Sequence, residues 1–407
     1  MRPLMLLFYV LAALVVLQSL LSLRGGVRYL DFFRRELGAP RALYMPYASV
    51  FVPCRGVDPG LRLNLLALFW QHYPAYELVF VSDSAEDPGL EIARQLTLEL
   101  EGETVARSRF VVAGRAADSG QKVHNLRAAV AEADAASEVF AFVDTDARPR
   151  ADWLRALVAP LADEGAGAAT GYRWFLPVAG GLASQLRSVW NASIASALGA
   201  NARGNFCWGG STAVRRETFE RLDVSGRWRG TVSDDYALTN ALRAAGLPVR
   251  FVPACLTASV EDCTLPELFE FTTRQLKITR VYSPRLWAFV LVSNLLFVLV
   301  FFGGLALAGV RAGLGLPFAW PLVIVSVIFL LGLWKAFFRL RAVALVLEEH
   351  HGRLRRGVWA HLTLWPLTAA LFLYNAAAAA LSRRIVWRGI GYELKSPTET
   401  EIIEPDA

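Results

Sequence analysis

Two aspartates separated by one residue, Asp144 and Asp146, have the type and spacing that best fit chemistry in this chain. They follow the short apolar run 139–143, which predicts a strand buried on both faces. Ligands of open α/β sheets bind beyond the carboxyl ends of the strands. A carboxylate pair there suits a divalent cation that shares its shell with water and substrate phosphates. Asp144 and Asp146 are therefore predicted to hold Mn²⁺ or Mg²⁺; the alternative is a solvated loop with two acids.

Two further aspartates are candidate site residues, one after a predicted strand and one at a predicted helix start. Asp83 directly follows the apolar run 76–82, a second predicted strand. Asp235 belongs to the stretch 231–236, which predicts the start of a helix. Its carboxylate is interpreted as a general base that points into a cleft. The structural alternative is a capped helix start, because acids suit the positive end of the helix dipole and Thr231 or Ser233 fits the N-cap.

A glycine pair and a row of cations complete the candidate residues. Gly210 lies in the loop 205–211, where two glycines beside aromatic residues permit close backbone approach to a ligand; a tight turn around a core tryptophan is the alternative. In the predicted helix 265–282, cations recur at Arg274, Lys277 and Arg280. They would neutralise a pyrophosphate if they face a cleft, or anchor the helix if they face lipid headgroups.

The elements that must position these residues alternate regularly. Predicted strands at 48–53, 76–82, about 109–112 and 139–143 are separated by predicted helices at 61–72, 87–101 and 122–133. This alternation predicts an α/β domain with a mixed, mostly parallel sheet and right-handed crossovers. The chain has no G-x-G-x-x-G and no P-loop, so a glycine-rich phosphate cradle is excluded as the binding mode.

The apolar residues gather in four long stretches. The chain has 407 residues, is 55% hydrophobic and has a mean hydropathy of +0.37. Each stretch is long enough to cross a bilayer core as a helix; they are 4–23, 286–310, 316–334 and 358–381. The first resembles an anchor more than a cleaved signal peptide, because its apolar part exceeds a typical signal core and no small-x-small site follows.

The basic residues predict the orientation of the spans. Five arginines closely follow the first stretch, which predicts a globular domain on the cytoplasmic face of the cell membrane. A fourth crossing at 358–381 would place the basic C-terminal segment outside, against the same rule. Either this stretch is re-entrant or interfacial, or another stretch is not a full crossing. The basic segment 24–47 is interpreted as an interfacial connector, with a plain linker as the alternative.

Charge and cysteine content exclude several classes. The net charge of +6 is concentrated beside the apolar stretches, and the globular part has no basic stripe, so no nucleic-acid partner is predicted. The four cysteines show no CxxC spacing and no histidine near them in sequence, which disfavours zinc and disulfides. No oligomeric state follows from the sequence.

The order of these motifs resembles that of the membrane-anchored family 2/21 glycosyltransferases with a GT-A fold, most of all the ceramide glucosyltransferases. Three spaced aspartates match Asp83 in VFVSDSAEDP, Asp144 in FVDTDA and Asp235 in SDDYALTNAL. The lead-in GQKVHNL, which contains Lys122, the segment GGSTAVRR and the tail 386–394 also resemble this family. One motif departs: the family's (R/Q)xxRW position reads RQLKI here, so a lysine and an isoleucine stand for Arg and Trp. Lysine lacks the bidentate guanidinium of arginine, and isoleucine lacks the aromatic ring of tryptophan. These changes bear on the identity of the acceptor more than on the chemistry of the donor.

The resemblance implies an inverting hexosyltransferase that uses a nucleotide diphosphate sugar, most simply UDP-glucose, and a membrane lipid acceptor such as ceramide. A hopanoid, diacylglycerol or polyprenyl phosphate would fit the same architecture, and a non-catalytic nucleotide-sugar-binding scaffold is the alternative from another class. The implied roles are Asp235 as catalytic base, Asp144 and Asp146 as metal ligands, and donor binding by Asp83, Lys122, Asp144, Gly210, Arg274, Lys277 and Arg280.

The expected domains follow the same plan. They are an N-terminal transmembrane anchor (1–23), the basic connector (24–47), a cytoplasmic GT-A catalytic domain (48–284), a C-terminal membrane region of two or three spans (285–382) and a tail with the WRGxxY segment (383–407).

Overall fold

The computed structural model describes residues 2–403, with side chains from residue 5 onward. The chain forms two compact units, each built from separate segments. We call them the sheet unit (36–174, 197–259 and 383–407) and the helical unit (1–35, 175–196 and 260–382).

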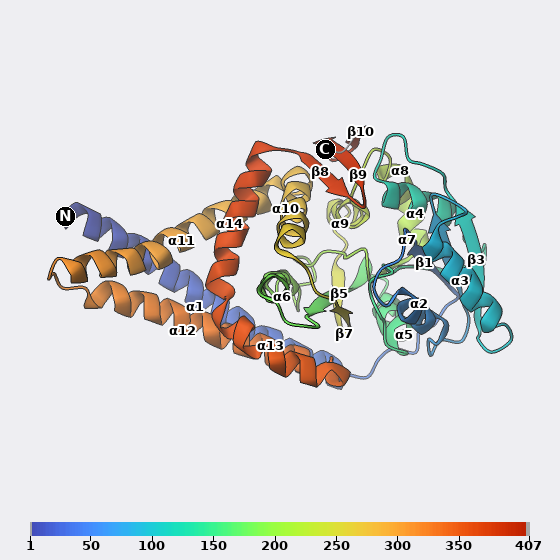
Figure 1. The fold of residues 1–407 in the computed structure, drawn as a ribbon. Coiled ribbons are helices and arrows are strands. Elements are labelled where there is room, and N and C mark those ends of the chain that lie inside the picture. The colour runs from blue at the N-terminus through green and yellow to red at the C-terminus, as the bar shows by residue number, and fades with distance from the viewer. Residues whose placement is uncertain (1, 404–407) are drawn as a thin grey trace. The chain divides into compact units, whose positions relative to one another are not determined.

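The sheet unit is built on seven strands in the order β3-β2-β1-β4-β6-β5-β7. Several of them, such as β3 and β5, are labelled in Figure 1. The central strands β1 (Ala48–Pro53), β2 (Tyr76–Ser82), β3 (Ala106–Val112) and β4 (Val139–Phe142) pair in parallel. Beyond β4, the strand β6 (Thr212–Arg215) pairs antiparallel with both β4 and β5 (Ala168–Leu176). The strand β7 (Val249–Val260) follows β5 in the sheet and forms its edge. This mixed, mostly parallel sheet confirms the predicted fold class.

Both faces of this sheet are buried, which explains why its strands are continuous apolar runs. Side chains alternate between two apolar clusters: Val50 and Val52 join one, and Phe51 joins the other. Helices α2 (Leu61–Phe69) and α3 (Pro88–Glu99) pack on the first face. Helix α4 (Gln121–Ala131) and helix α9 (Asp234–Ala244) pack on the second.

The C-terminal segment adds a second sheet to this unit. Strands β8 (Arg384–Trp387), β9 (Ile390–Ser396) and β10 (Glu399–Ile403) form an antiparallel meander. Arg388 and Gly389 turn the chain between β8 and β9 with positive φ values of 52° and 76°. The Tyr392 hydroxyl accepts a hydrogen bond from the Gln121 amide at the start of α4, and Thr400 donates to the Gly230 carbonyl.

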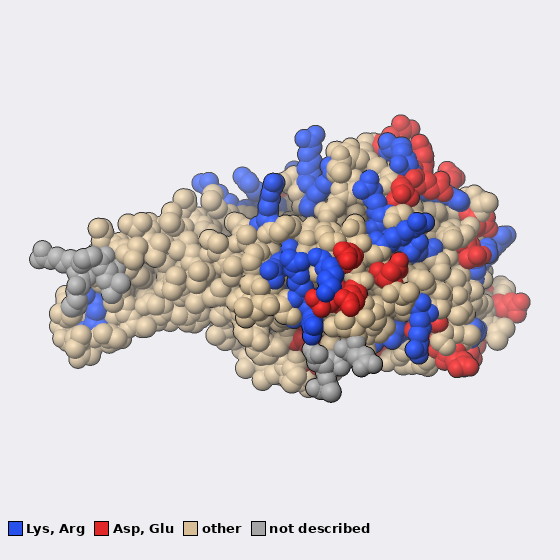
Figure 2. Space-filling view, turned by 90° about the horizontal axis from the view of Figure 1, so that it is seen from above, with Lys and Arg blue, Asp and Glu red and all other residues tan. Residues whose placement is uncertain are grey.

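Three helices within residues 2–403 are long and apolar enough to cross a membrane: α1 (Arg2–Gly38), α11 (Pro284–Gly313) and α12 (Ala319–Ala344). They lie side by side in Figure 1 and share an apolar cluster that includes Val15, Phe301 and Ile328. Charged side chains are scarce on their visible surface in Figure 2. Helix α1 continues through much of the predicted connector.

The fourth apolar stretch is broken. Helices α13 (His351–Thr363) and α14 (Trp365–Leu381) meet at a 71° bend, the geometry of a broken span or a re-entrant loop. Pro366 at the start of α14 explains the break, because proline donates no backbone hydrogen bond and restricts the residue before it. The helical unit also contains α6 (Leu182–Ala195) and α10 (Leu265–Tyr282), which pack with α14.

Candidate active site

The predicted strand-end acids lie on one edge of the sheet. Asp83 directly follows β2, and Asp144 lies two residues beyond β4. Both strands pair in parallel with β1, so their carboxyl ends meet at the same edge. The acid Asp83 pairs with Arg55 at 2.9 Å, and Arg55 itself follows β1. This is the edge at which α/β folds bind ligands.

Lys122, in the first turn of α4, links two of the acids. Its Nζ lies 2.7 Å from Asp144 Oδ1 and 3.3 Å from Asp234 Oδ1. Burial alone would lower the pKa of Lys122, but the two carboxylates outweigh it and raise the pKa. Burial likewise opposes ionisation of Asp144, but Lys122 and Arg173 hold its pKa below the usual range. Lys122 and Asp144 therefore remain charged at neutral pH.

Arg173 on β5 provides a second cation that the sequence analysis missed. Its guanidinium contacts Asp146 Oδ2 at 2.8 Å and Asp144 Oδ2 at 3.7 Å. The same group lies over the Trp208 ring, 4.9 Å from its centroid. A single arginine within a strand carries no sequence signal, and its role depends on which strands pair.

The two adjacent acids at the start of α9 differ in environment. Asp234 is 5% exposed and faces Lys122. Burial raises its pKa to about 6, assisted by Asp235 and Asp144 and opposed by Lys122. Asp235 is half-buried, and its Oδ1 accepts hydrogen bonds from the Ser233 hydroxyl and the Tyr236 amide. Ser233, rather than Thr231, is the N-cap residue. For Asp234, the sequence indicated only that an acid suits the positive end of the helix dipole.

The glycine pair lies against this cluster. A Cβ at Gly209 would lie 2.5 Å from Asp234 Oδ2 and 2.7 Å from Lys122 Nζ. A Cβ at Gly210 would lie 2.2 Å from the Trp208 ring. Trp208 is 7% exposed and packs on Tyr172, as expected for a core side chain. The close approach of backbone to charge therefore occurs at Gly209, and a donor contact by Gly210 remains a prediction.

If the sugar transfer that the motif order implies takes place at this cluster, replacing Gly209 by alanine should lower its rate by about 100-fold, because a misplaced charged group costs that much and the new Cβ would overlap both Lys122 and Asp234. Steady-state rates with a nucleotide sugar would measure it. Gly199 is the matched control, since a Cβ there meets nothing within 4 Å. Equal rates for the two variants would contradict this account.

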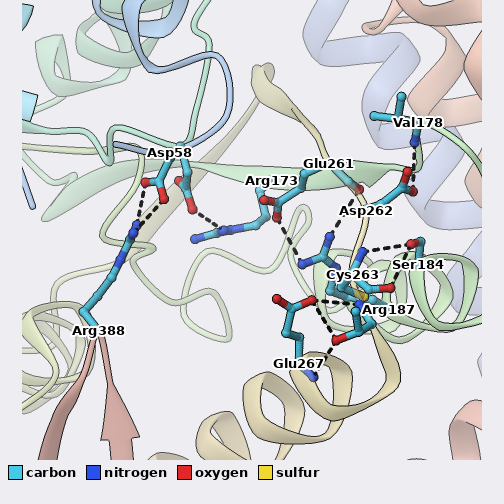
Figure 3. Close-up of polar contacts among 12 residues, drawn as sticks. Asp58, Arg173, Val178, Ser184, Arg187, Glu261, Asp262, Cys263, Glu267 and Arg388 are labelled. Carbon is cyan, nitrogen blue, oxygen red and sulfur yellow. Dashed lines mark hydrogen bonds and ion pairs between the residues drawn. The ribbon is translucent and has the colours of Figure 1, made fainter. Parts of the chain in front are cut away.

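The C-terminal sheet brings another arginine to the same unit. The Arg388 guanidinium pairs bidentately with the Asp58 carboxylate at 2.6 and 2.5 Å (Figure 3). The pKa of Arg388 is raised, first by this hydrogen bond and further by Asp146 and Asp144, so it adds to the field at the aspartate pair. The tail segment that contains Arg388 was recognisable in the sequence. The sequence assigned Arg388 no role, because it lies 330 positions from Asp58.

The three predicted α10 cations belong to the helical unit, so their relation to the strand-end acids stays a prediction. Arg274 pairs with Glu270 at 3.2 Å. Lys277 is half-buried. Arg280 donates to the Ala379 carbonyl and lies 5.5 Å over the Trp287 ring, which ties α10 to α14 and α11.

The aspartate pair fits a divalent cation whose coordination shell is completed by water and substrate phosphates. Within the described residues, no group of three or more His, Cys, Asp or Glu side chains is placed to enclose a metal. Asp144 and Asp146 supply two carboxylates, and no described residue forms a hydrogen bond with the buried Asp146 Oδ1. Mg²⁺-type sites that use one or two carboxylates, water and substrate phosphates have this donor set. Lys122 and Arg173 now neutralise two other oxygens of this pair, Asp144 Oδ1 and Asp146 Oδ2.

Comparisons with known proteins find several to which this chain is similar. The chain is 28% identical over 81 residues to a ceramide glucosyltransferase of Komagataella phaffii, a match over 20% of this chain and 16% of that protein. The chain thus spans less than two thirds of that relative's length. Among solved structures, a mannosyltransferase from Pyrobaculum calidifontis in complex with GDP-Man and Mn²⁺ is 19% identical, with 91% of this chain and 99% of that chain covered and a TM-score of 0.46.

Glucosyl-3-phosphoglycerate synthase from Mycobacterium tuberculosis, in complex with Mn²⁺, UDP and glucosyl-3-phosphoglycerate, is 15% identical, with 58% of this chain and 79% of that chain covered and a TM-score of 0.35. The profile of glycosyl transferase family 21 matches residues 7–400, nearly the whole chain. The resemblance seen in the motif order is thereby confirmed, and the chain belongs to glycosyl transferase family 21.

Proposed function

We propose that this glycosyltransferase is an inverting hexosyltransferase that moves a hexose, with glucose as the first candidate, from a nucleotide diphosphate sugar to the hydroxyl of a membrane lipid. A ceramide-like acceptor is the first choice, and the catalytic sheet unit is assigned to the cytoplasmic face. The observation that carries the proposal is the charge cluster at the end of β4, where Asp144 and Asp146 meet Lys122 and Arg173.

The proposed donor site follows from the charge that develops. A nucleoside diphosphate leaving group accumulates negative charge on its phosphate oxygens. Asp144 and Asp146 would hold the divalent cation, which supplies charge stabilisation without proton transfer when bound. Lys122, Arg173 and Arg388 add fixed positive charge in the same unit. Arg274, Lys277 and Arg280 are assigned to the same leaving group.

The remaining roles are nucleotide binding and removal of the acceptor proton. Asp83, held by Arg55, is assigned to hydrogen bonding with the nucleobase or ribose. Asp235 is assigned as the base that takes the proton of the acceptor hydroxyl as its oxygen attacks the anomeric carbon. One in-line displacement inverts that carbon and needs one base. Asp234 would position Lys122 through their ion pair.

A lipid acceptor is supported by the helical unit. Its helices α1, α11 and α12 are apolar enough to span a membrane, and they belong to the same chain as the charge cluster. Ceramide is favoured by the family membership and by the partial match to a ceramide glucosyltransferase. A hopanoid, diacylglycerol or polyprenyl phosphate is the alternative acceptor.

An acceptor screen tests the proposal. Purified full-length protein with radiolabelled UDP-glucose, Mn²⁺ or Mg²⁺ and a panel of lipids should yield a labelled product in the organic phase, identified by mass spectrometry. Other nucleotide sugars extend the screen to the donor. UDP binding without transfer or donor hydrolysis, for every sugar and lipid, would instead identify a non-catalytic scaffold.

Acidification should expose the role of Asp234. Its raised pKa of about 6 means that it gains a proton as the pH falls through this value and loses its attraction for Lys122. Transfer, measured as kcat/KM against pH, should therefore fall below about pH 6 and recover above it. The Asp234→Asn variant, which cannot titrate, should lack this step; an unchanged acid limb would assign it to another group.

A further inference from the structure

The helical unit contains a buried cation for which the described residues provide no carboxylate. Arg339 on α12 is 3% exposed, and its Nε has no hydrogen-bond partner among the described residues. Arg341, two residues further along the helix, is exposed and lies over the Phe337 ring at 6.0 Å. Long basic side chains at the end of a span ordinarily extend to water or headgroups as Arg341 does. Arg339 instead points into the protein.

The groups around Arg339 are a second cation and two neutral polar side chains. Tyr29 of α1, Lys335 of α12 and His361 of α13 lie within electrostatic range of its guanidinium. Tyr29 is 3% exposed, and its hydroxyl has no hydrogen-bond partner within the part of the chain that the structure describes. Helix α1 packs closely on Lys335, because a Cβ at Gly26 would lie 3.2 Å from Lys335 Cγ. Three helices thus converge on a site with two cations and no carboxylate among the described residues.

An ionised side chain buried without a counter-charge is strongly unfavourable. Arginine does not escape this cost by losing its proton, since its guanidinium stays charged in proteins. Lys335 increases the cost, because it repels Arg339. No side chain among residues 5–403 supplies this counter-charge, and a phosphate group from a ligand would match the guanidinium fork.

The position of the site indicates a lipid as the source of this phosphate. Arg339 and Lys335 lie just beyond the apolar stretch 316–334, where a span reaches headgroup depth. Exposed apolar side chains on α1, such as Leu21, and on α12, such as Leu330 and Trp334, offer a surface for acyl chains. Basic pockets between membrane helices are known binding places for anionic lipid headgroups.

We propose that Arg339, Lys335 and Tyr29 bind the phosphate of a net-anionic phospholipid headgroup between α1, α12 and α13. This site lies within the helical unit and uses none of the residues assigned to sugar transfer. The lipid is a bound structural and regulatory ligand, separate from the acceptor, so its test does not depend on transferase activity.

Thermal unfolding of the full-length protein in neutral detergent micelles tests the site. Added dioleoylphosphatidylglycerol should raise the Tm by about 4 °C over dioleoylphosphatidylcholine, as expected for a ligand well above its Kd. Arg339→Gln should abolish this difference, while Arg341→Gln, the matched exposed control, should keep it. Without anionic lipid, Arg339→Gln should be at least as stable as the parent protein, because an unpaired charge has been removed.

Other outcomes overturn the proposal. An equal rise with inorganic phosphate would assign the site to free anions, and an equal loss in both arginine variants would assign the effect to general surface charge. If Arg339→Gln does not fold, Tyr29→Phe must weaken the phosphatidylglycerol effect, since it removes one donor and no charge. Native mass spectrometry provides a second readout: the parent protein and Arg341→Gln should retain phosphatidylglycerol, and Tyr29→Phe should retain less. Equal retention by all three would contradict the site.

Discussion

Replacing Asp235 by asparagine should leave UDP binding intact and lower sugar transfer by about 10²–10⁴-fold, the range that a positioned general base contributes. The amide is nearly isosteric with the carboxylate, and its oxygen can still accept the hydrogen bonds from Ser233 and Tyr236. It cannot take a proton from an acceptor hydroxyl at neutral pH. Calorimetric titration with UDP and transfer assays would separate binding from catalysis.

The control for Asp235 is the neighbouring cap. Ser233→Ala removes the side chain that caps α9 and should cost about 1 kcal/mol of stability without abolishing transfer. If Ser233→Ala loses activity as strongly as Asp235→Asn, the aspartate acts through helix capping. If Asp235→Asn stays active and Asp234→Asn does not, the base is Asp234, whose pKa of about 6 suits proton transfer near neutral pH.

Replacing Lys122 by methionine should have the second largest effect. The change leaves Asp144 and Asp234 buried without the ammonium that pairs with both. Breaking a buried ion pair by removing one partner costs about 3–5 kcal/mol. Loss of one electrostatic group at the leaving group costs about 10²–10³-fold in kcat. We therefore expect a lower Tm together with a loss of transfer in this range.

A double substitution separates the two consequences of losing Lys122. Asp234→Asn in the Lys122→Met background removes one of the stranded carboxylates and should recover part of the lost Tm, but not the activity. Lys395→Met is the matched control, because Lys395 is 41% exposed and pairs only with surface acids among the described residues. Lys122→Met with the Tm and rate of that control would refute the role of the ion pair.

The sequence determined the central elements of the sheet unit. Strands β1 and β2 cover the predicted residues 48–53 and 76–82, because each is a short, buried and largely apolar segment. Their alternation with helices implied parallel pairing, and parallel pairing places Asp83 and Asp144 on one edge. The apolar stretches similarly fixed α11 and α12, since length and hydropathy are properties of the chain itself.

The antiparallel part of the sheet and the C-terminal meander required the tertiary structure. No local pattern shows that β6 inserts between β4 and β5, and this insertion decides that Arg173 reaches Asp146. Arg388 meets Asp58 across 330 positions of the chain. Such contacts depend on how the chain returns, which composition and periodicity do not encode.

The aspartate pair illustrates the same division. Its residue types and its place after an apolar strand were legible in the sequence, because strand ends and acid spacing are local features. Its present partners, Lys122 and Arg173, come from α4 and β5, and only packing brings them to the same carboxylates. The pKa of Asp234 depends on burial and on three charged neighbours from separate elements. Sequence thus identified the groups, and tertiary structure decided their charge environment, because electrostatic interactions act through space rather than along the chain.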